Sequence, residues 1–170
     1  MFRYLISAVM TLILAASSFA QTDIKTEHRV ANVGNGFCGW CAVETLGRHQ
    51  GIKSLQGLVA RKHKALGDNG GGAWNSTLAS ELCSLGINHY YTHVGAYYRS
   101  MMQDAIAKNG GVVVGLRPVP PDKNGHYVVC VGYTDKHAYV IDSNDPKKTT
   151  KMSRAKFDNA WDGSMLVFGR

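Results

Sequence analysis

Proline is scarce in this 170-residue chain, and long apolar runs are confined to its first twenty residues. Four prolines occur in all, and none lies between Cys41 and Pro118. Beyond residue 20, no segment is apolar enough to cross a bilayer, so we expect no stable membrane association of the mature protein. The chain also lacks internal repeats and any sign of a second domain, which predicts a single folded unit.

Acidic residues are outnumbered by basic ones. Twelve aspartates and glutamates stand against nineteen lysines and arginines, which gives a formal net charge of +7. Such a surplus can favour nucleic acid or an anionic cell surface. No basic repeat or nucleic-acid motif accompanies it. We therefore interpret the basic clusters at 61–64 and 147–148 as solvated faces and expect no nucleic-acid partner.

The start of the chain has the layout of a secretory signal peptide. Arg3 provides a positive charge, residues 4–16 are almost all apolar, and Ser18-Phe19-Ala20 places small residues before Gln21. An uncleaved membrane anchor is the alternative, since the apolar stretch is close to the shortest that spans a bilayer. The small residues before Gln21 favour a signal peptide over residues 1–20, and hence a secreted or periplasmic protein.

The remaining 150 residues are enough for one domain. A chain of this length buries roughly 68–70% of its unfolded surface, so it needs neither a metal ion nor disulfides to fold. We predict a polar lead-in segment over residues 21–31 and a folded domain over residues 32–170.

Only four cysteines occur, at positions 38, 41, 83 and 130. In an oxidising compartment they would form two disulfides with three possible connectivities. If one of them is a catalytic thiol, at most one native disulfide remains possible. The sequence leaves this choice open.

The expected elements place helices first and strands later. Helices are expected from Cys38 to just before Gly51, over 54–65, over 76–85 with Ser76 as N-cap, over 96–108, and from Ser153 to Trp161; strands are expected over 87–94, 112–116, 127–133, 138–141 and 165–168. The short connection Thr134-Asp135-Lys136 predicts an antiparallel hairpin. This order indicates an α+β fold with a mostly antiparallel sheet.

Cys38 stands where a reactive thiol is expected. It follows the turn-rich run Val33-Gly34-Asn35-Gly36 and opens the first predicted helix. A helix N-terminus and a histidinium together lower the pKa of a thiol, which makes the nucleophilic thiolate available. Cys38 is therefore a candidate nucleophile.

A histidine and an aspartate are expected to meet on the predicted hairpin. His126 begins one apolar strand, and Asp142 directly follows the last apolar residue of the next strand. On an antiparallel hairpin the start of one strand lies beside the end of the other. We therefore expect Asp142 to orient the imidazole of His126, which would act as the base.

These features together resemble the papain-like cysteine peptidase superfamily, in particular the domain that removes double-glycine leader peptides in bacteriocin exporters and its stand-alone secreted relatives. The resemblance covers about residues 30–168 and depends on the following features: Cys38-Gly39 with Gly51 and Ser54-Leu55 behind it, the sixteen-residue interval from His126 to Asp142, and the ending Phe157, Trp161-Asp162-Gly163 and 165–168. It implies a papain-like α+β fold and an amide hydrolase with Cys38, His126 and Asp142 as its triad.

The resemblance also implies an amide side chain upstream of the nucleophile that donates to the oxyanion. Asn32 lies six residues before Cys38, and Asn35 lies six before Cys41. The family usually has Gln at this position, and asparagine is one methylene shorter. With Cys38 as nucleophile, the resemblance selects Asn32.

Two departures from the family pattern leave alternatives open. The family usually has Asp-Pro at the aspartate position, whereas here Asp142 is separated from Asp145-Pro146, so Asn144 or Asp145 is an alternative third member. Papain-like enzymes with Cys-Gly-Ser-Cys-Trp use the second cysteine, which makes Cys41 an alternative nucleophile. The spacing to Gly51 favours Cys38.

Three other functional classes compete with a hydrolase. Cys38-Gly39-Trp40-Cys41 has the CxxC spacing of thioredoxin-like redox proteins, but a polar loop precedes it and no proline faces it. A zinc site is disfavoured because the chain has one CxxC and no histidine at a recognised spacing. A non-catalytic papain-like binding module is the third alternative. We expect a peptide or peptidoglycan-type substrate, no metal and no cofactor; the sequence does not indicate an oligomeric state.

Overall fold

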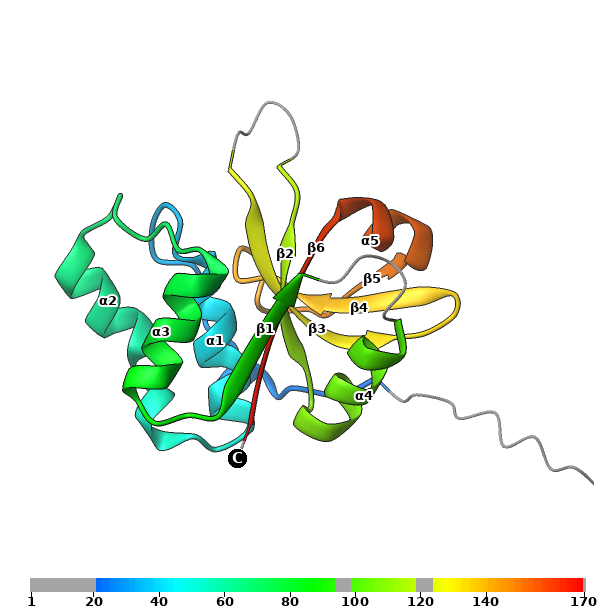
Figure 1. Cartoon of the computed structure of the whole chain (residues 1–170). Helices are drawn as coiled ribbons and strands as arrows, with labels where there is room; N and C mark the ends of the chain where they lie inside the picture. The colour runs from blue at the N-terminus through cyan, green and yellow to red at the C-terminus, as the bar shows by residue number, and fades with distance from the viewer. Residues whose placement is uncertain (1–20, 94–98, 119–123, 170) are drawn as a thin grey trace, which may run out of the picture.

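The computed structural model describes residues 21–93, 99–118 and 124–169 (Figure 1). The predicted signal peptide lies outside these residues, as do the end of the strand predicted to reach residue 94 and the start of the helix predicted from residue 96. In the part of the chain that the structure describes, no helix combines the length and apolar character needed to cross a membrane.

A six-stranded sheet forms the centre of the molecule, and every neighbouring pair of strands is antiparallel. In spatial order the strands are β1 (His89–His93), β6 (Trp161–Phe168), β2 (Val112–Leu116), β3 (His126–Tyr133), β4 (His137–Ile141) and β5 (Thr150–Ser153). The predicted hairpin is present as β3 and β4. The α+β class is therefore confirmed.

Helices cover both faces of this sheet (Figure 1). On one face lie α1 (Cys38–His49), α2 (Leu58–Leu66) and α3 (Asn75–Ser84); on the other lie α4 (Arg99–Asn109) and α5 (Arg154–Ala160). The short 3-10 turns η1 (Thr26–His28) and η2 (Lys53–Leu55) belong to the first layer. Successive side chains of β2 point alternately to the two helix layers: Val113 packs with α1, whereas Val112 and Val114 pack with α4.

Helix α1 is enclosed by its neighbours, and residues 38–47 are all buried. Its Gly47 permits a close approach, because a Cβ there would lie 2.8 Å from the Cβ of Leu55. Glu44, 1% exposed, accepts hydrogen bonds from the backbone N–H groups of Gly57 and Val59 at 2.8 and 2.7 Å and pairs with Arg48. A buried carboxylate thus ties the start of α2 to α1.

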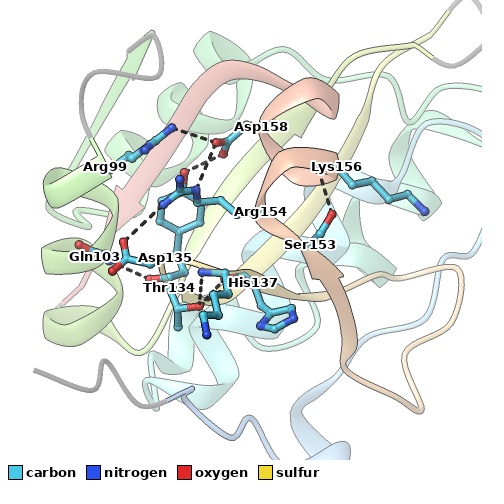
Figure 2. A network of polar contacts seen from close by, with 11 residues as sticks. Arg99, Gln103, Thr134, Asp135, His137, Ser153, Arg154, Lys156 and Asp158 are labelled. Carbon is cyan, nitrogen blue, oxygen red and sulfur yellow. Dashed lines mark hydrogen bonds and ion pairs between the residues drawn. The ribbon is translucent and has the colours of Figure 1, made fainter. Parts of the chain in front are cut away.

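On the opposite face, a polar network joins α4, α5 and the β3–β4 hairpin (Figure 2). Asp158 accepts a 2.6 Å hydrogen bond from the hydroxyl of Tyr133 and forms ion pairs with Arg99 and Arg154. Gln103 donates to the carbonyl of Tyr133 at 3.0 Å. These contacts connect the second helix layer to the hairpin that carries His126.

Several predicted boundaries are wrong for identifiable reasons. The helix predicted over 54–65 is interrupted because Gly57 adopts the left-handed conformation (φ +73°), which separates η2 from α2. Ser76 does not cap α3, which begins one residue earlier with Trp74 at the N-cap and no side-chain cap. Strand β5 was not expected, and β6 begins four residues before the predicted strand. The capping role of Ser153 is confirmed by a 3.3 Å hydrogen bond from the N–H of Lys156.

Candidate active site

The thiol of Cys38 lies at the N-terminus of α1. The turn before it uses Gly36 with φ +80°, and a Cβ at Gly36 would lie 2.6 Å from the backbone nitrogen of Gly72. The indole N–H of Trp40 donates to the carbonyl of Gly71 at 3.1 Å. The glycine-rich loop after α2 thus packs against the turn and holds the first residue of α1 in place.

His126 and Asp142 meet at the open end of the β3–β4 hairpin. β3 begins at His126, β4 ends at Ile141, and Val129 lies opposite Ile141 in their register. Nε2 of His126 lies 2.8 Å from Oδ1 of Asp142, so the adjacency expected from the hairpin is confirmed. Because Nε2 faces the carboxylate, Nδ1 is the ring nitrogen left for the thiol.

The second strand residue completes the contact with the thiol. The backbone N–H of Tyr127 donates to Sγ of Cys38 at 3.4 Å. Burial raises the pKa of the Cys38 thiol, but the hydrogen bond with His126, the Tyr127 N–H and the histidine charge outweigh burial and hold that pKa below its ordinary value. Cys38 is 6% exposed, so a small part of this residue remains open to solvent.

His126 shows the matching shift. Burial lowers the pKa of the imidazole, but hydrogen bonds with Asp142 and Cys38, together with their charges, raise it to about 10. Burial raises the pKa of the Asp142 carboxyl, but the hydrogen bonds with His126 and with the N–H of Asn144 outweigh burial and hold that pKa below its ordinary value. The three groups therefore favour a thiolate, an imidazolium and a carboxylate at neutral pH.

Cys41, the alternative nucleophile, has a different environment. It is fully buried, its Sγ contacts the carbonyl oxygen of Ala31 at 3.4 Å, and burial together with the charges of Cys38 and Glu44 raises its thiol pKa to about 12. Such a thiol stays protonated and is a weak nucleophile. All four cysteines are free thiols in this structure, so Cys38 and Cys41 are not joined in a redox disulfide.

The two candidate amides occupy different places. Asn32 lies beside the loop that follows Asp142: its N–H donates to the carbonyl of Ser143 at 2.9 Å, and its Nδ2 donates to Oδ1 of Asn144 at 2.9 Å. Asn35 instead donates to Asn69 in the glycine-rich loop at 2.8 Å. Of the two, Asn32 is thus held by the segment that carries Asp142.

The alternative third members do not contact the imidazole in the hydrogen bonds and ion pairs of the described residues. The backbone N–H of Asn144 donates to Oδ1 of Asp142 at 2.9 Å, and its side chain pairs with Asn32. Asp145 forms an exposed ion pair with Lys148. Asn144 therefore supports Asp142 and Asn32 and does not take the place of Asp142.

Tyr127 is a site residue that sequence reasoning missed. A Cβ added to Gly39 would lie 3.1 Å from Cδ2 of the Tyr127 ring and 3.2 Å from Cδ1 of Leu78 on α3. The ring thus crosses from the sheet to the helix layer beside Cys38. No local pattern in the sequence marks this position, because it depends on how α1 and α3 pack against the start of β3.

Chemically, the arrangement supplies the parts of nucleophilic catalysis. A thiolate at a helix N-terminus, an imidazolium within its reach and a carboxylate that orients the imidazole are what acyl transfer by a cysteine requires. Within the described ranges, no three His, Cys, Asp or Glu side chains are placed to bind a metal ion.

One protein-family profile matches this chain. The profile described as the Peptidase_C39 like family matches residues 13–165, which is most of the chain. No curated protein matches it in sequence.

Solved structures share the fold at low sequence identity. The peptidase domain of Streptococcus ComA, a bifunctional ABC transporter involved in quorum sensing, is 17% identical with a TM-score of 0.63; the match covers 82% of this chain and 96% of that domain. A double-glycine-motif protease of an AMS/PCAT transporter, solved with its leader peptide, is 16% identical with a TM-score of 0.59 and coverages of 87% and 92%. A Bacillus anthracis protein described as C39-like is 12% identical with a TM-score of 0.67 and coverages of 88% and 96%. These similarities confirm the predicted papain-like α+β fold.

Proposed function

This chain belongs to the Peptidase_C39 like family, and we propose that it is an exported cysteine peptidase that cleaves a peptide bond with Cys38, His126 and Asp142. The family and its fold support a papain-like cysteine peptidase. The observation that carries the residue assignment is the 2.8 Å contact between His126 and Asp142 beside a thiol whose pKa is lowered.

The reaction follows from the positions of these groups. The Cys38 thiolate attacks the substrate carbonyl, a C–S bond forms, and the carbonyl electrons move to oxygen. When the C–N bond breaks, the proton on Nδ1 of His126 passes to the leaving amine, which leaves a thioester on Cys38. Neutral His126 then takes a proton from water, whose oxygen attacks the thioester and releases the acid and the thiolate.

Asp142 and Asn32 support these steps. Through Nε2 of His126, the Asp142 carboxylate keeps Nδ1 directed at the thiol and stabilises the imidazolium. The oxyanion receives hydrogen bonds from the side-chain amide of Asn32 and the backbone N–H of Cys38. Asn144 holds the Asn32 amide through the 2.9 Å hydrogen bond between their side chains.

Side chains crowd the backbone next to Cys38. A Cβ at Gly39 would lie 3.1 Å from the Tyr127 ring and 3.2 Å from the side chain of Leu78, which leaves little room for a bulky substrate residue there. The double-glycine-motif protease with a similar fold is solved in complex with a leader peptide. We therefore propose peptides with glycine or alanine at the cleaved bond as the substrate class.

Hydrolysis of defined peptides tests the proposal. The mature chain and its Cys38→Ala variant are incubated with peptides that contain Gly-Gly, Ala-Gly or Leu-Leu, and with peptidoglycan fragments, and the products are identified by mass spectrometry. We expect cleavage of the small-residue peptides by the native chain alone. If Cys38→Ala retains the activity, or if only a dithiol–disulfide exchange is detected, the peptidase proposal is wrong; cleavage of peptidoglycan fragments alone would change the substrate class.

A further inference from the structure

The lead-in segment before the nucleophile (residues 21–31) is packed into the domain. Its Ile24 is completely buried and belongs to the same core cluster as the buried face of α1. The backbone N–H of Val30 donates to Oγ1 of Thr45, a buried residue of α1, at 3.0 Å. Because the segment leads directly into Asn32, its packing helps to decide where that side chain lies.

Arg29 joins the lead-in segment to the loop between β4 and β5. Its side chain is only 6% exposed. Nε donates to the carbonyl of Ile24 at 2.7 Å, while the two Nη atoms donate to the carbonyl of Pro146 at 3.3 Å and to Oγ1 of Thr149 at 3.1 Å. The carboxylate of Asp23 lies 3.7 Å away and is largely exposed. The guanidinium therefore acts mainly as a fork that bridges neutral acceptors on two segments.

The same β4–β5 loop begins at Asp142 and supports Asn32. The carbonyl of Ser143 accepts the N–H of Asn32 at 2.9 Å, and Oδ1 of Asn144 accepts its Nδ2 at 2.9 Å. The backbone N–H of Asn144 in turn donates to Oδ1 of Asp142 at 2.9 Å. The lead-in segment and the loop are thus joined at two places, by Asn32 near the thiol and by Arg29 farther along the loop.

We propose that Arg29 is a positioning residue, which holds the β4–β5 loop against the lead-in segment so that the Asn32 amide stays directed at the oxyanion. Loops move more than the elements they connect, and a displacement of about 1 Å at a catalytic group can cost about 10² in rate. The inference rests on the proposed peptidase function, since it assigns a support to one of the groups in that reaction.

Arg29→Lys tests this role in the full mature chain. Lysine keeps the positive charge but lacks the planar fork that reaches three acceptors at once. We expect kcat on a Gly-Gly peptide to fall about tenfold while KM changes by less than about twofold. Alkylation of Cys38 at pH 6 should keep its native rate, because the contacts of that thiol come from β3.

A double variant identifies the group through which Arg29 acts. In the Asn32→Ala background, Arg29→Lys should lower kcat by less than about twofold, because the side chain that it positions is already gone. A role of Arg29 in general stability alone would give the same fractional loss of kcat in both backgrounds.

Two further variants complete the kinetic test. Thr149→Val removes one acceptor of the guanidinium and should lower kcat about threefold, so it replaces Arg29→Lys if that variant does not fold. Arg61→Lys is the matched control, because Arg61 also donates to two backbone carbonyls, those of Ser54 and Gln56, each at 2.8 Å. Arg61 does not contact the β4–β5 loop through these bonds, so kcat should stay at its native value.

Hydrogen exchange provides a measurement that needs no catalysis. The N–H groups of Asn32 and Asn144 both donate to residues of the β4–β5 loop. NMR should show faster exchange of these two amides in Arg29→Lys, or in Thr149→Val, than in the native chain and in Arg61→Lys.

The outcomes separate this inference from the peptidase proposal. A native kcat in folded Arg29→Lys or in Thr149→Val, a full tenfold further loss in the Asn32→Ala background, or unchanged exchange at Asn32 and Asn144 would overturn the positioning role. Faster exchange in a chain whose native form cleaves no peptide would leave the support of the loop by Arg29 intact and refute the peptidase proposal.

Discussion

The backbone N–H of Tyr127 donates to Sγ of Cys38 over 3.4 Å, so the strand that carries the imidazole also contacts the thiol. The nucleophile comes from the helix layer and the base comes from the sheet. Their relative position therefore depends on how firmly α1 packs against β3, and both elements are mostly buried. Catalysis and the stability of this interface are expected to change together.

Alkylation will identify the nucleophile. At pH 6, iodoacetamide should modify Cys38 at least about tenfold faster than the exposed Cys83, because the lowered pKa supplies thiolate at Cys38. Peptide mapping by mass spectrometry measures both rates in one sample. His126→Ala should slow only the reaction of Cys38. Equal rates at Cys38 and Cys83, or a disulfide between Cys38 and Cys41, would contradict the assignment.

The pH profile should depend on Asp142. Activity needs the thiolate and the imidazolium, so kcat/KM should rise as pH passes the lowered pKa of Cys38 and fall near pH 10, where His126 loses its proton. Asp142→Asn removes a group that raises the pKa of His126, so the alkaline limb should move to lower pH. An alkaline limb that stays in place in Asp142→Asn would show that Asp142 does not orient the base.

We expect Asn32 to contribute directly to kcat, and we expect Asn144 to contribute by holding the Asn32 side chain. Asn32→Ala should lower kcat by about 10² to 10³ with little change in KM, as expected for an oxyanion donor. Asn144→Ala, which frees the Asn32 side chain, should lower kcat less. Asn35→Ala is the control because Asn35 contacts Asn69 instead. If Asn35→Ala is the more damaging change, the oxyanion assignment is wrong.

Glu44 should dominate the stability of the helix layer. Glu44→Ala leaves the N–H groups of Gly57 and Val59 without their acceptor inside the protein, so the free energy of unfolding should fall by about 3 kcal/mol in urea titrations. Lys148→Ala, which breaks an exposed pair with Asp145, should leave the urea midpoint almost unchanged. Similar losses in both variants would refute this role of Glu44.

The parts of the site that lie on one local motif were predictable. His126 and Asp142 belong to a single hairpin, whose pairing follows from a three-residue connection. Cys38 begins a helix, and the glycine-rich turn before it indicates where that helix starts. The split of the second helix at Gly57 was not predictable, because glycine is tolerated inside helices and its left-handed φ depends on the packing around it. Strand β5 is short and half exposed, so it has no apolar pattern by which to recognise it.

The choice between the two cysteines needed tertiary contacts. The sequence by itself determined the α+β class, the hairpin and the candidate residues, since these follow from periodicity, turns and local spacing. Only the tertiary structure decided which thiol faces His126, which amide lies beside Asn144, and that Tyr127 adjoins the thiol. Electrostatic environment depends on distances between segments far apart in the chain, and those distances are set by packing.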